Sequence, residues 1–330
     1  MAYSLDDLLN PQVSKVTRST DNLIITTYGA RGQGKTPVAT KMEKPFYFAF
    51  GKSGLSGINN VDFQPVNSWS DFKSLVKLFS NKKNYEQLHE KYHTLVLDEM
   101  EILYKYCEQY VASTEGVRKI KEGNGGYGLW GDLKDEWENE IMKIIGSGFC
   151  VMFILHACAD DTGKVMPVGD LKRMLPIILN HSDIIGYVRG NGSDPETGKP
   201  IHSSLMLSDT DEYFARTRNE YFVPYIEDYT AENLVNAYYD ALDRQEKAEG
   251  TSTVTKEEGD KMYEKQRITF DELMEKVAGC IEKMCNAKRD EEVVDIVEKT
   301  LGKGGKVSQC TAKQYEAVEV ILNDLEEALA

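Results

Sequence analysis

The feature that most restricts the fold is a glycine-rich octapeptide, GARGQGKT, at residues 29–36. It fits the pattern GxxxxGK[ST], and it lies between a β-branched run and a helical stretch expected over Thr36–Met42, as that pattern requires. Glycines allow successive backbone N–H groups to point inward around a phosphate, and a following helix N-terminus adds partial positive charge. The sequence therefore predicts a phosphate cradle. Its residues are Gly29, Ala30, Arg31, Gly32, Gln33, Gly34, Lys35 and Thr36.

A second segment completes the predicted nucleotide site. The pattern assigns Lys35 to the β- and γ-phosphates and the Thr36 hydroxyl to Mg²⁺, so ATP and Mg²⁺ are the expected cofactors. The apolar run HTLVLDE ends in two acids, of which Asp98 would hold the hydration shell of Mg²⁺ and Glu99 would polarise an attacking water. The alternatives are a carboxylate at Asp98 that caps the next helix and a solvated helix-start glutamate at Glu99.

His156 ends another apolar run, CVMFILH. A polar side chain at the tip of the strand beside the nucleotide strand can sense loss of the γ-phosphate. Histidine suits this role because it donates to phosphate and changes charge near neutrality. An ordinary strand-end histidine is the alternative interpretation.

Alternating apolar runs and helical stretches predict an α/β fold. Because strands that alternate with helices form βαβ units, we expect a mostly parallel, twisted sheet with helices on both faces. Short strands within residues 184–223 predict a β-hairpin or meander at one edge. The expected strands after the first are Phe46–Phe50, Val61–Val66, Thr94–Leu97, Cys150–Leu155, Ile184–Arg189, Ser203–Leu207 and Tyr213–Arg216. The expected helices between the first five strands are Thr36–Met42, Trp69–Phe79, Met100–Ala112 and Gly131–Ile145.

Composition divides the chain into four parts. We expect a flexible arm over residues 1–20, a nucleotide-binding core over 21–228, a helix and polar linker over 229–260, and an acidic helical module over 261–330. The helical spacing of the module predicts two apolar stripes. They consist of Phe270, Met274, Val277 and Ile281, and of Val318, Ile321 and Leu325.

The sequence shows no membrane span or secretory signal, and its cysteines are dispersed. These features predict a cytoplasmic protein with no membrane partner. No run approaches the ~20 apolar residues of a membrane span, and the start MAYSLDDLLN lacks the basic and apolar regions of a secretory signal. The dispersed cysteines form no CxxC pair and have no nearby histidine spacing of a zinc site, so we expect reduced thiols and no structural metal. They are Cys107, Cys150, Cys158, Cys280, Cys285 and Cys310.

Four segments within residues 22–228 carry a family resemblance: YGARGQGKT, LVLDE, GGYGLWGDLKDEWENEIMKIIGSGFCVMFILHA and FARTRNEYFVPYI. The chain resembles the RecA/KaiC-like P-loop ATPases, and more closely the phage-encoded, Sak-type single-strand-annealing ATP-binding proteins. The resemblance implies a RecA-like core, ATP hydrolysis, and a role in phage DNA recombination or annealing inside a bacterial host. Relatives often place an acid just after the second strand, whereas Phe50 is followed here by GKSG. The role of polarising the attacking water then falls to Glu99, or hydrolysis is slow.

The resemblance also implies self-association as a ring or filament. In RecA-like assemblies a basic pair on a late strand reaches the nucleotide of the neighbouring subunit, and such a trans arginine raises the rate by orders of magnitude. Arg216 and Arg218 in the sequence ARTR have the spacing of one strand face and are the candidates. A solvated basic strand edge is the alternative.

Two loops have the composition expected for binding single-stranded DNA. They combine positive charge for phosphates, aromatic rings for stacking and glycine for adaptability. In residues 116–131 the candidates are Arg118, Lys119, Lys121, Tyr127 and Trp130, and in residues 160–173 they are Lys164, Lys172 and Arg173. Ordinary lysines on mobile surface loops are the alternative. Because the net charge is −15, a broad DNA clamp is excluded and any binding should be local, weak and salt-dependent.

The sequence thus favours a Mg²⁺- and ATP-dependent RecA-like ATPase acting in phage DNA recombination or single-strand annealing. A nucleotide-gated module that oligomerises or recruits partners with little turnover is the alternative. Residues 251–330 hold 18 acidic and 12 basic residues, so the C-terminal module could dock a single-strand-binding or other recombination protein.

Overall fold

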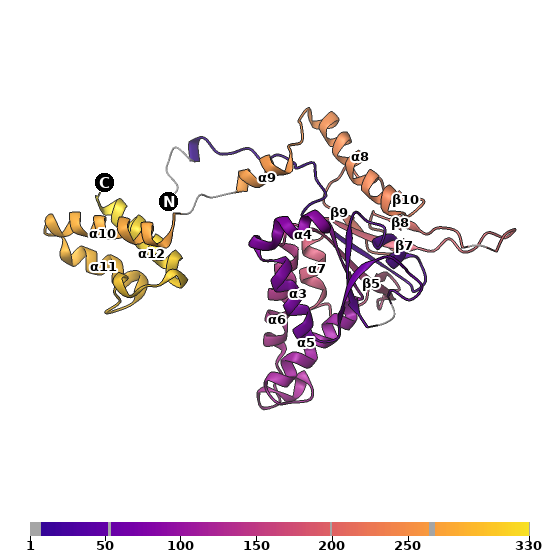
Figure 1. Cartoon of the computed structure of the whole chain (residues 1–330), viewed down its shortest axis with the longest axis horizontal. Helices are drawn as coiled ribbons and strands as arrows, with labels where there is room; N and C mark the ends of the chain where they lie inside the picture. The colour runs from indigo at the N-terminus through magenta and orange to yellow at the C-terminus, as the bar shows by residue number, and fades with distance from the viewer. Residues whose placement is uncertain (1–7, 52–53, 199, 264–267, 330) are drawn as a thin grey trace. The chain divides into compact units, whose positions relative to one another are not determined.

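The computed structural model describes residues 8–51, 54–198, 200–263 and 268–329 (Figure 1). The chain forms two compact units: Lys15–Lys256 is the first, and the segments before and after it make up the second. The first unit extends beyond the core expected over 21–228. One reason is that the backbone of Val254 hydrogen-bonds to Val16 and Arg18, and another is that the helix after residue 230 packs against the sheet.

A ten-stranded mixed sheet forms the centre of the first unit. Its main strand order is β10-β8-β7-β1-β5-β4-β2-β3, and the six strands from β7 to β3 run parallel to one another. The strands are β1 (Ile24–Gly29), β2 (Pro45–Phe50), β3 (Asp62–Val66), β4 (Thr94–Asp98), β5 (Cys150–Ala159), β6 (Val165–Pro167), β7 (Ile184–Arg189), β8 (Ser204–Met206), β9 (Arg216–Thr217) and β10 (Tyr225–Ile226). Antiparallel pairing of β7 with β8 and of β8 with β10 forms the edge meander that the sequence predicts.

Helices cover both faces of this sheet. In the first unit they are α2 (Lys35–Ala39), α3 (Trp69–Phe79), α4 (Tyr85–Lys91), α5 (Met100–Thr114), α6 (Trp130–Ile145), α7 (Leu175–His181) and α8 (Ala231–Glu249). Helices α3, α5 and α6 lie side by side on one face (Figure 1), and α2 and α8 pack on the other. The prediction of a mostly parallel sheet flanked by helices is therefore confirmed.

Covering both faces explains why the central strands are continuous apolar runs. In β5, Val151, Phe153 and Leu155 pack toward α3, α5 and α6, whereas Met152 and Ile154 pack toward α2 and α8. All five side chains are buried. Because alternate side chains of a strand point to opposite faces, one run contributes to both cores.

Several elements differ from the prediction. The strand expected over Tyr213–Arg216 shares only Arg216 with the observed β9 (Arg216–Thr217), and α4, α7, β6 and β10 were not expected. Helix α4 (YEQLHEK) buries none of its residues, and α7 (LPIILNH) has only seven residues with a proline at the second, so neither carries a long apolar period. Strands β6 and β10 are two or three residues long and depend on their pairing partners.

The second unit contains a small helical core of its own. Helices α10 (Phe270–Asn286), α11 (Asp290–Leu301) and α12 (Tyr315–Leu329) pack together, and α9 (Lys256–Tyr263) begins at the last residue of the first unit. The predicted stripe on α12 is buried as expected, but on α10 the most buried side chains are Leu273, Val277, Cys280 and Met284, and Phe270, Met274 and Ile281 pack around their edge. Among the described residues, no helix has both the length and the apolar character that crossing a membrane requires.

Candidate active site

The glycine-rich loop connects the end of β1 to the start of α2. Gly32 and Gly34 have φ angles of 78° and 80°, a left-handed conformation that glycine adopts without strain. A Cβ atom at Gly29 would lie 2.6 Å from the carbonyl oxygen of Val188 on β7, so the neighbouring strand also requires glycine there. The loop therefore has the local geometry that the octapeptide predicts.

Lys35 lies inside this loop. Its Nζ atom donates hydrogen bonds to the carbonyl oxygens of Gly29 and Ala30, each at 2.8 Å, and the residue is only 6% exposed. Burial lowers the pKa of Lys35, an effect that the nearby carboxylates of Asp98, Glu101 and Glu99 oppose. The ammonium group is thus held at the centre of the predicted cradle.

Asp98 at the end of β4 receives two hydroxyl donors. The Thr36 hydroxyl donates to Asp98 Oδ2 at 2.5 Å, and the Tyr47 hydroxyl donates to the same oxygen at 2.7 Å. Burial and the charge of Asp98 raise the pKa of Tyr47, so its hydroxyl remains a donor. A threonine hydroxyl beside a carboxylate is an oxygen donor set that suits Mg²⁺, and Thr36 and Asp98 are the residues that would hold it.

Tyr47 was not among the residues predicted from the sequence. Replacing it with phenylalanine removes a hydrogen bond to a buried carboxylate, so we expect the first unit to lose about 1.5 kcal/mol of unfolding free energy. Urea unfolding followed by tryptophan fluorescence reports on this unit, because Trp69, Trp130 and Trp137 all lie in it. The exposed Tyr225→Phe serves as the control. Equal stability of Tyr47→Phe and the parent would show that this bond contributes nothing.

Two glutamates and His156 meet on the other side of the cleft. His156 Nδ1 lies 3.4 Å from Glu99 Oε2 and 3.4 Å from Glu101 Oε1, and the backbone N–H of His156 donates to Glu101 Oε1 at 2.6 Å. Burial raises the pKa of Glu101, and the bond from the His156 backbone opposes that rise. Glu101 was also missed by the sequence analysis; its only signal is its place in the first turn of α5, just after the acidic strand end.

Strand order brings these groups together. Strand β5 lies between β1 and β4, and His156 is the register partner of Gly29 at the carboxyl end of the sheet. A cleft of about 550 Å³ opens at this end. Its lining includes Arg31, Gly32, Gln33, Gly34, Lys35, Thr36, Asp98, Glu99 and His156. The structure thus gathers the predicted cradle, metal and sensor residues around one cavity.

Part of the cleft lining follows β2 in the chain and consists of Gly54, Ser56, Gly57 and Ile58. Gly54 lines the cavity, and a Cβ atom there would collide with the Tyr47 hydroxyl. Of the GKSG sequence that departs from the family pattern, residues 52 and 53 lie outside the described part of the chain. Gly54 therefore leaves room for the Tyr47–Asp98 hydrogen bond.

Comparison with known proteins places the chain in a family. A family model described as an AAA domain matches residues 21–219. The chain belongs to the AAA-domain family. It is also 44% identical, over 324 residues covering 98% of this chain and 99% of the relative, to the SPbeta prophage-derived uncharacterized protein YorG of Bacillus subtilis (strain 168). The family match supports a P-loop ATPase, and the phage origin and the narrower Sak-type resemblance stay predictions.

The arginine pair of this AAA-domain protein lies at the opposite end of the sheet from the cradle. Arg216 Nη2 donates to the carbonyl oxygens of Leu179, at 2.6 Å, and of Ser182, at 3.2 Å. Arg218 Nη2 donates to the Asn180 carbonyl oxygen at 2.7 Å. Both guanidinium groups thus bind the end of α7 and the segment that follows it.

The predicted DNA-binding loops meet each other. The Arg173 guanidinium lies 4.4 Å from the ring centroid of Trp130, a cation–π contact that joins residues 160–173 to residues 116–131. Next to it is a cavity of about 320 Å³, lined in part by Arg118, Lys119, Lys121 and Trp130. Tyr127 is 86% exposed. Lys164 instead pairs with both carboxylate oxygens of Asp209 at 2.9 Å, and Lys172 lies exposed on the same segment as Arg173.

Proposed function

We propose that this AAA-domain protein is a Mg²⁺-dependent ATPase that binds single-stranded DNA and acts in phage recombination or strand annealing. In this proposal Lys35 binds the β- and γ-phosphates, and Thr36 and Asp98 would hold Mg²⁺, which would supply positive charge beside those phosphates. Glu99 accepts the proton of the attacking water, and His156 contacts the γ-phosphate. The cleft geometry and the family match support the nucleotide part of the proposal.

A continuous strand supports coupling between ATP and DNA. Strand β5 passes His156 and continues to Ala159, where it pairs with β6 in an antiparallel hairpin. The chain then reaches Arg173, which stacks on Trp130. Movement of His156 on loss of the γ-phosphate would therefore shift the segment that carries part of the basic, aromatic surface. This connection is the observation that carries the proposal.

The charge distribution supports a local DNA site. With a net charge of −15 the protein as a whole repels DNA, so affinity must come from a patch where basic residues gather. Arg118, Lys119 and Lys121 line one cavity with Trp130, and the exposed Tyr127 ring offers a stacking surface close by in sequence. Glu108 also lines this cavity, which should keep the binding weak.

Assembly of several copies remains part of the proposal. Arg216 and Arg218 lie at the amino end of the parallel strands, so any nucleotide they contact belongs to another copy. They would first exchange the carbonyl partners that they bind within their own chain. The acidic second unit is the proposed docking element for a recombination protein.

ATP turnover with and without single-stranded DNA tests this function. We expect a single strand to raise Mg²⁺-dependent turnover severalfold at low salt, more than a duplex of the same sequence does. The stimulation should fall as salt rises, because phosphate contacts release counterions. Turnover that single strands leave unchanged at low salt would refute the DNA role. ATP-dependent assembly with negligible turnover would instead favour a nucleotide-gated interaction module.

The lysines of the basic cavity give a more local test. A plot of log affinity for single-stranded DNA against log salt concentration has a negative slope, to which each phosphate contact contributes about 0.7. In the double variant Lys119→Gln/Lys121→Gln, two contacts are lost, so the magnitude of this slope should fall by about 1.4. The exposed pair Lys82→Gln/Lys83→Gln removes the same charge elsewhere and serves as the control. Equal slopes in the two double variants would place the DNA site away from this cavity.

A further inference from the structure

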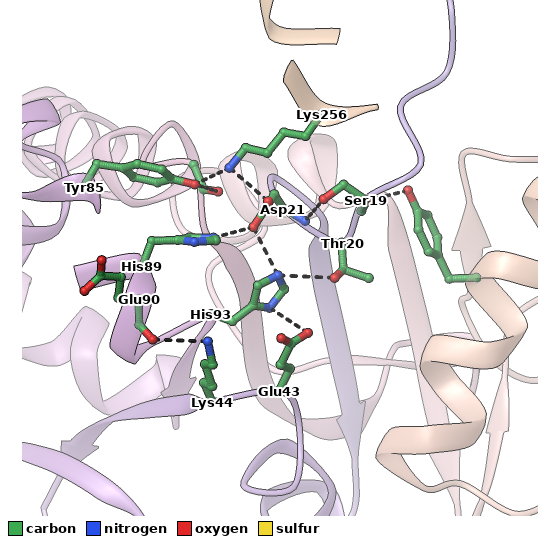
Figure 2. A network of polar contacts seen from close by, with 12 residues as sticks. Ser19, Thr20, Asp21, Glu43, Lys44, Tyr85, His89, Glu90, His93 and Lys256 are labelled. Carbon is green, nitrogen blue, oxygen red and sulfur yellow. Dashed lines mark hydrogen bonds and ion pairs between the residues drawn. The ribbon is translucent and has the colours of Figure 1, made fainter. Parts of the chain in front are cut away.

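A cluster of polar side chains lies at the amino end of the parallel strands, whereas the nucleotide cleft lies at their carboxyl end. Figure 2 shows the contacts within this cluster. Asp21 precedes β1, His89 belongs to α4, and His93 precedes β4. The side chains of Asp21 and His93 are 9% and 10% exposed, and that of His89 is 27% exposed. From the convergence of these three groups we infer that the protein binds a divalent transition-metal ion, such as Zn²⁺, through Asp21, His89 and His93.

The three ligand atoms already point at one another. His89 Nε2 lies 2.7 Å from Asp21 Oδ1, His93 Nε2 lies 3.1 Å from the same oxygen, and all three atoms lie within 4.8 Å of one another. Ligands bound about 2.0–2.1 Å from a tetrahedral Zn²⁺ stand roughly 3.3 Å apart. An ion between the three atoms therefore requires only small movements of side chains.

Backbone hydrogen bonds hold His93 in place, and ring stacking holds His89. The N–H of His93 donates to Lys44 O at 2.9 Å, and His93 O accepts from the N–H of Cys150 at 3.1 Å. The His89 ring stacks on Tyr85 with centroids 5.0 Å apart. Because two of the three ligands are held in this way, an ion would meet a preformed site.

The surroundings match those of a metal-binding histidine. Within the described chain, His93 Nδ1 is buried and has no hydrogen-bond partner, and the Glu43 carboxylate lies 3.9 Å from it. A proton on Nδ1 facing Glu43 leaves the lone pair of Nε2 for the ion, and carboxylates commonly orient metal-bound histidines in this way. Two imidazoles with one carboxylate suit Zn²⁺ or Co²⁺, whereas Mg²⁺ and Ca²⁺ prefer oxygen ligands alone.

Lys256 binds the other carboxylate oxygen of Asp21. Its ammonium lies 2.9 Å from Asp21 Oδ2 and also contacts the Tyr85 hydroxyl, so Oδ1 remains available to the ion. Because the Lys256 charge opposes a second cation, its removal should strengthen metal binding.

Cobalt titration of the full chain tests this site. The titration uses protein without a purification tag, and ADP with excess Mg²⁺ is added to occupy the nucleotide cleft. We expect one Co²⁺ per chain, visible d–d absorption of four-coordinate cobalt, no sulfur-to-cobalt charge-transfer band, and release of Co²⁺ by Zn²⁺. Absence of the d–d absorption, or a charge-transfer band that assigns the ion to cysteine, would overturn the inference.

Three variants localise the signal. His89→Gln should weaken Co²⁺ binding at least about tenfold, because it deletes a ligand, and tryptophan fluorescence checks that it stays folded. His202→Gln removes an exposed histidine and should leave the affinity unchanged. Lys256→Met should bind Co²⁺ severalfold more tightly. Unchanged affinity in His89→Gln, or weaker binding in Lys256→Met, would contradict the site.

Discussion

Replacing Lys35 with alanine is expected to reduce ATP turnover at least about a hundredfold, because it removes a preorganised positive charge from the phosphate cradle. The ammonium group donates hydrogen bonds to the carbonyl oxygens of Gly29 and Ala30 within the loop. ATP affinity should fall together with turnover. Equilibrium binding of a fluorescent ATP analogue and steady-state phosphate release measure the two effects.

A neighbouring lysine provides the control for that experiment. Lys41 is exposed just after α2, so Lys41→Ala removes the same charge close to the cradle without touching the cleft. It should keep ATP affinity and turnover near the parent values. If Lys35→Ala binds ATP as tightly as Lys41→Ala does, the cradle is not where we place it.

Glu99→Gln is expected to reduce turnover by about a hundredfold or more, the usual contribution of a general base, while ATP still binds. The amide keeps the size of the side chain but cannot accept a proton from water. Lys35, Thr36 and Asp98 remain unchanged, so the phosphates and Mg²⁺ keep their ligands. Single-turnover hydrolysis alongside ATP binding separates the two steps.

A comparison with Glu101→Gln shows which of the two glutamates is the general base. Both glutamates lie 3.4 Å from His156 Nδ1, but Glu101 also accepts the His156 backbone N–H and burial raises its pKa. We therefore expect Glu101→Gln to act mainly by loosening His156, with a smaller loss of hydrolysis than in Glu99→Gln. Glu115→Gln, at the far end of α5, is the matched control. A larger loss in Glu101→Gln than in Glu99→Gln would reassign the base to Glu101.

The sequence could predict the parts of the site that short segments specify. The octapeptide determines its own loop, because Gly32 and Gly34 need left-handed backbone and the lysine follows directly. Long apolar runs predicted the central strands, since burial on both faces leaves little room for polar residues. His156 could be placed beside the cradle because it ends such a run.

Other features depend on contacts between distant segments. Tyr47 lies in the apolar run FYFAF, and only the pairing of β2 with β4 brings its hydroxyl to Asp98. The spacing of His89 and His93 is visible in sequence, but Asp21 joins them only through the fold. The sequence suggested two separate DNA loops, and it carried no sign that Arg173 would stack on Trp130.

The most direct test of the coupling proposal measures single-stranded DNA affinity in two nucleotide states. Glu99→Gln with ATP and Mg²⁺ holds the triphosphate state, and the same variant with ADP provides the other. We expect the two affinities to differ severalfold at low salt, and His156→Ala added to Glu99→Gln to remove the difference without abolishing ATP binding. Equal affinities in the ATP and ADP states would contradict a path from the γ-phosphate through β5 to the DNA-binding surface.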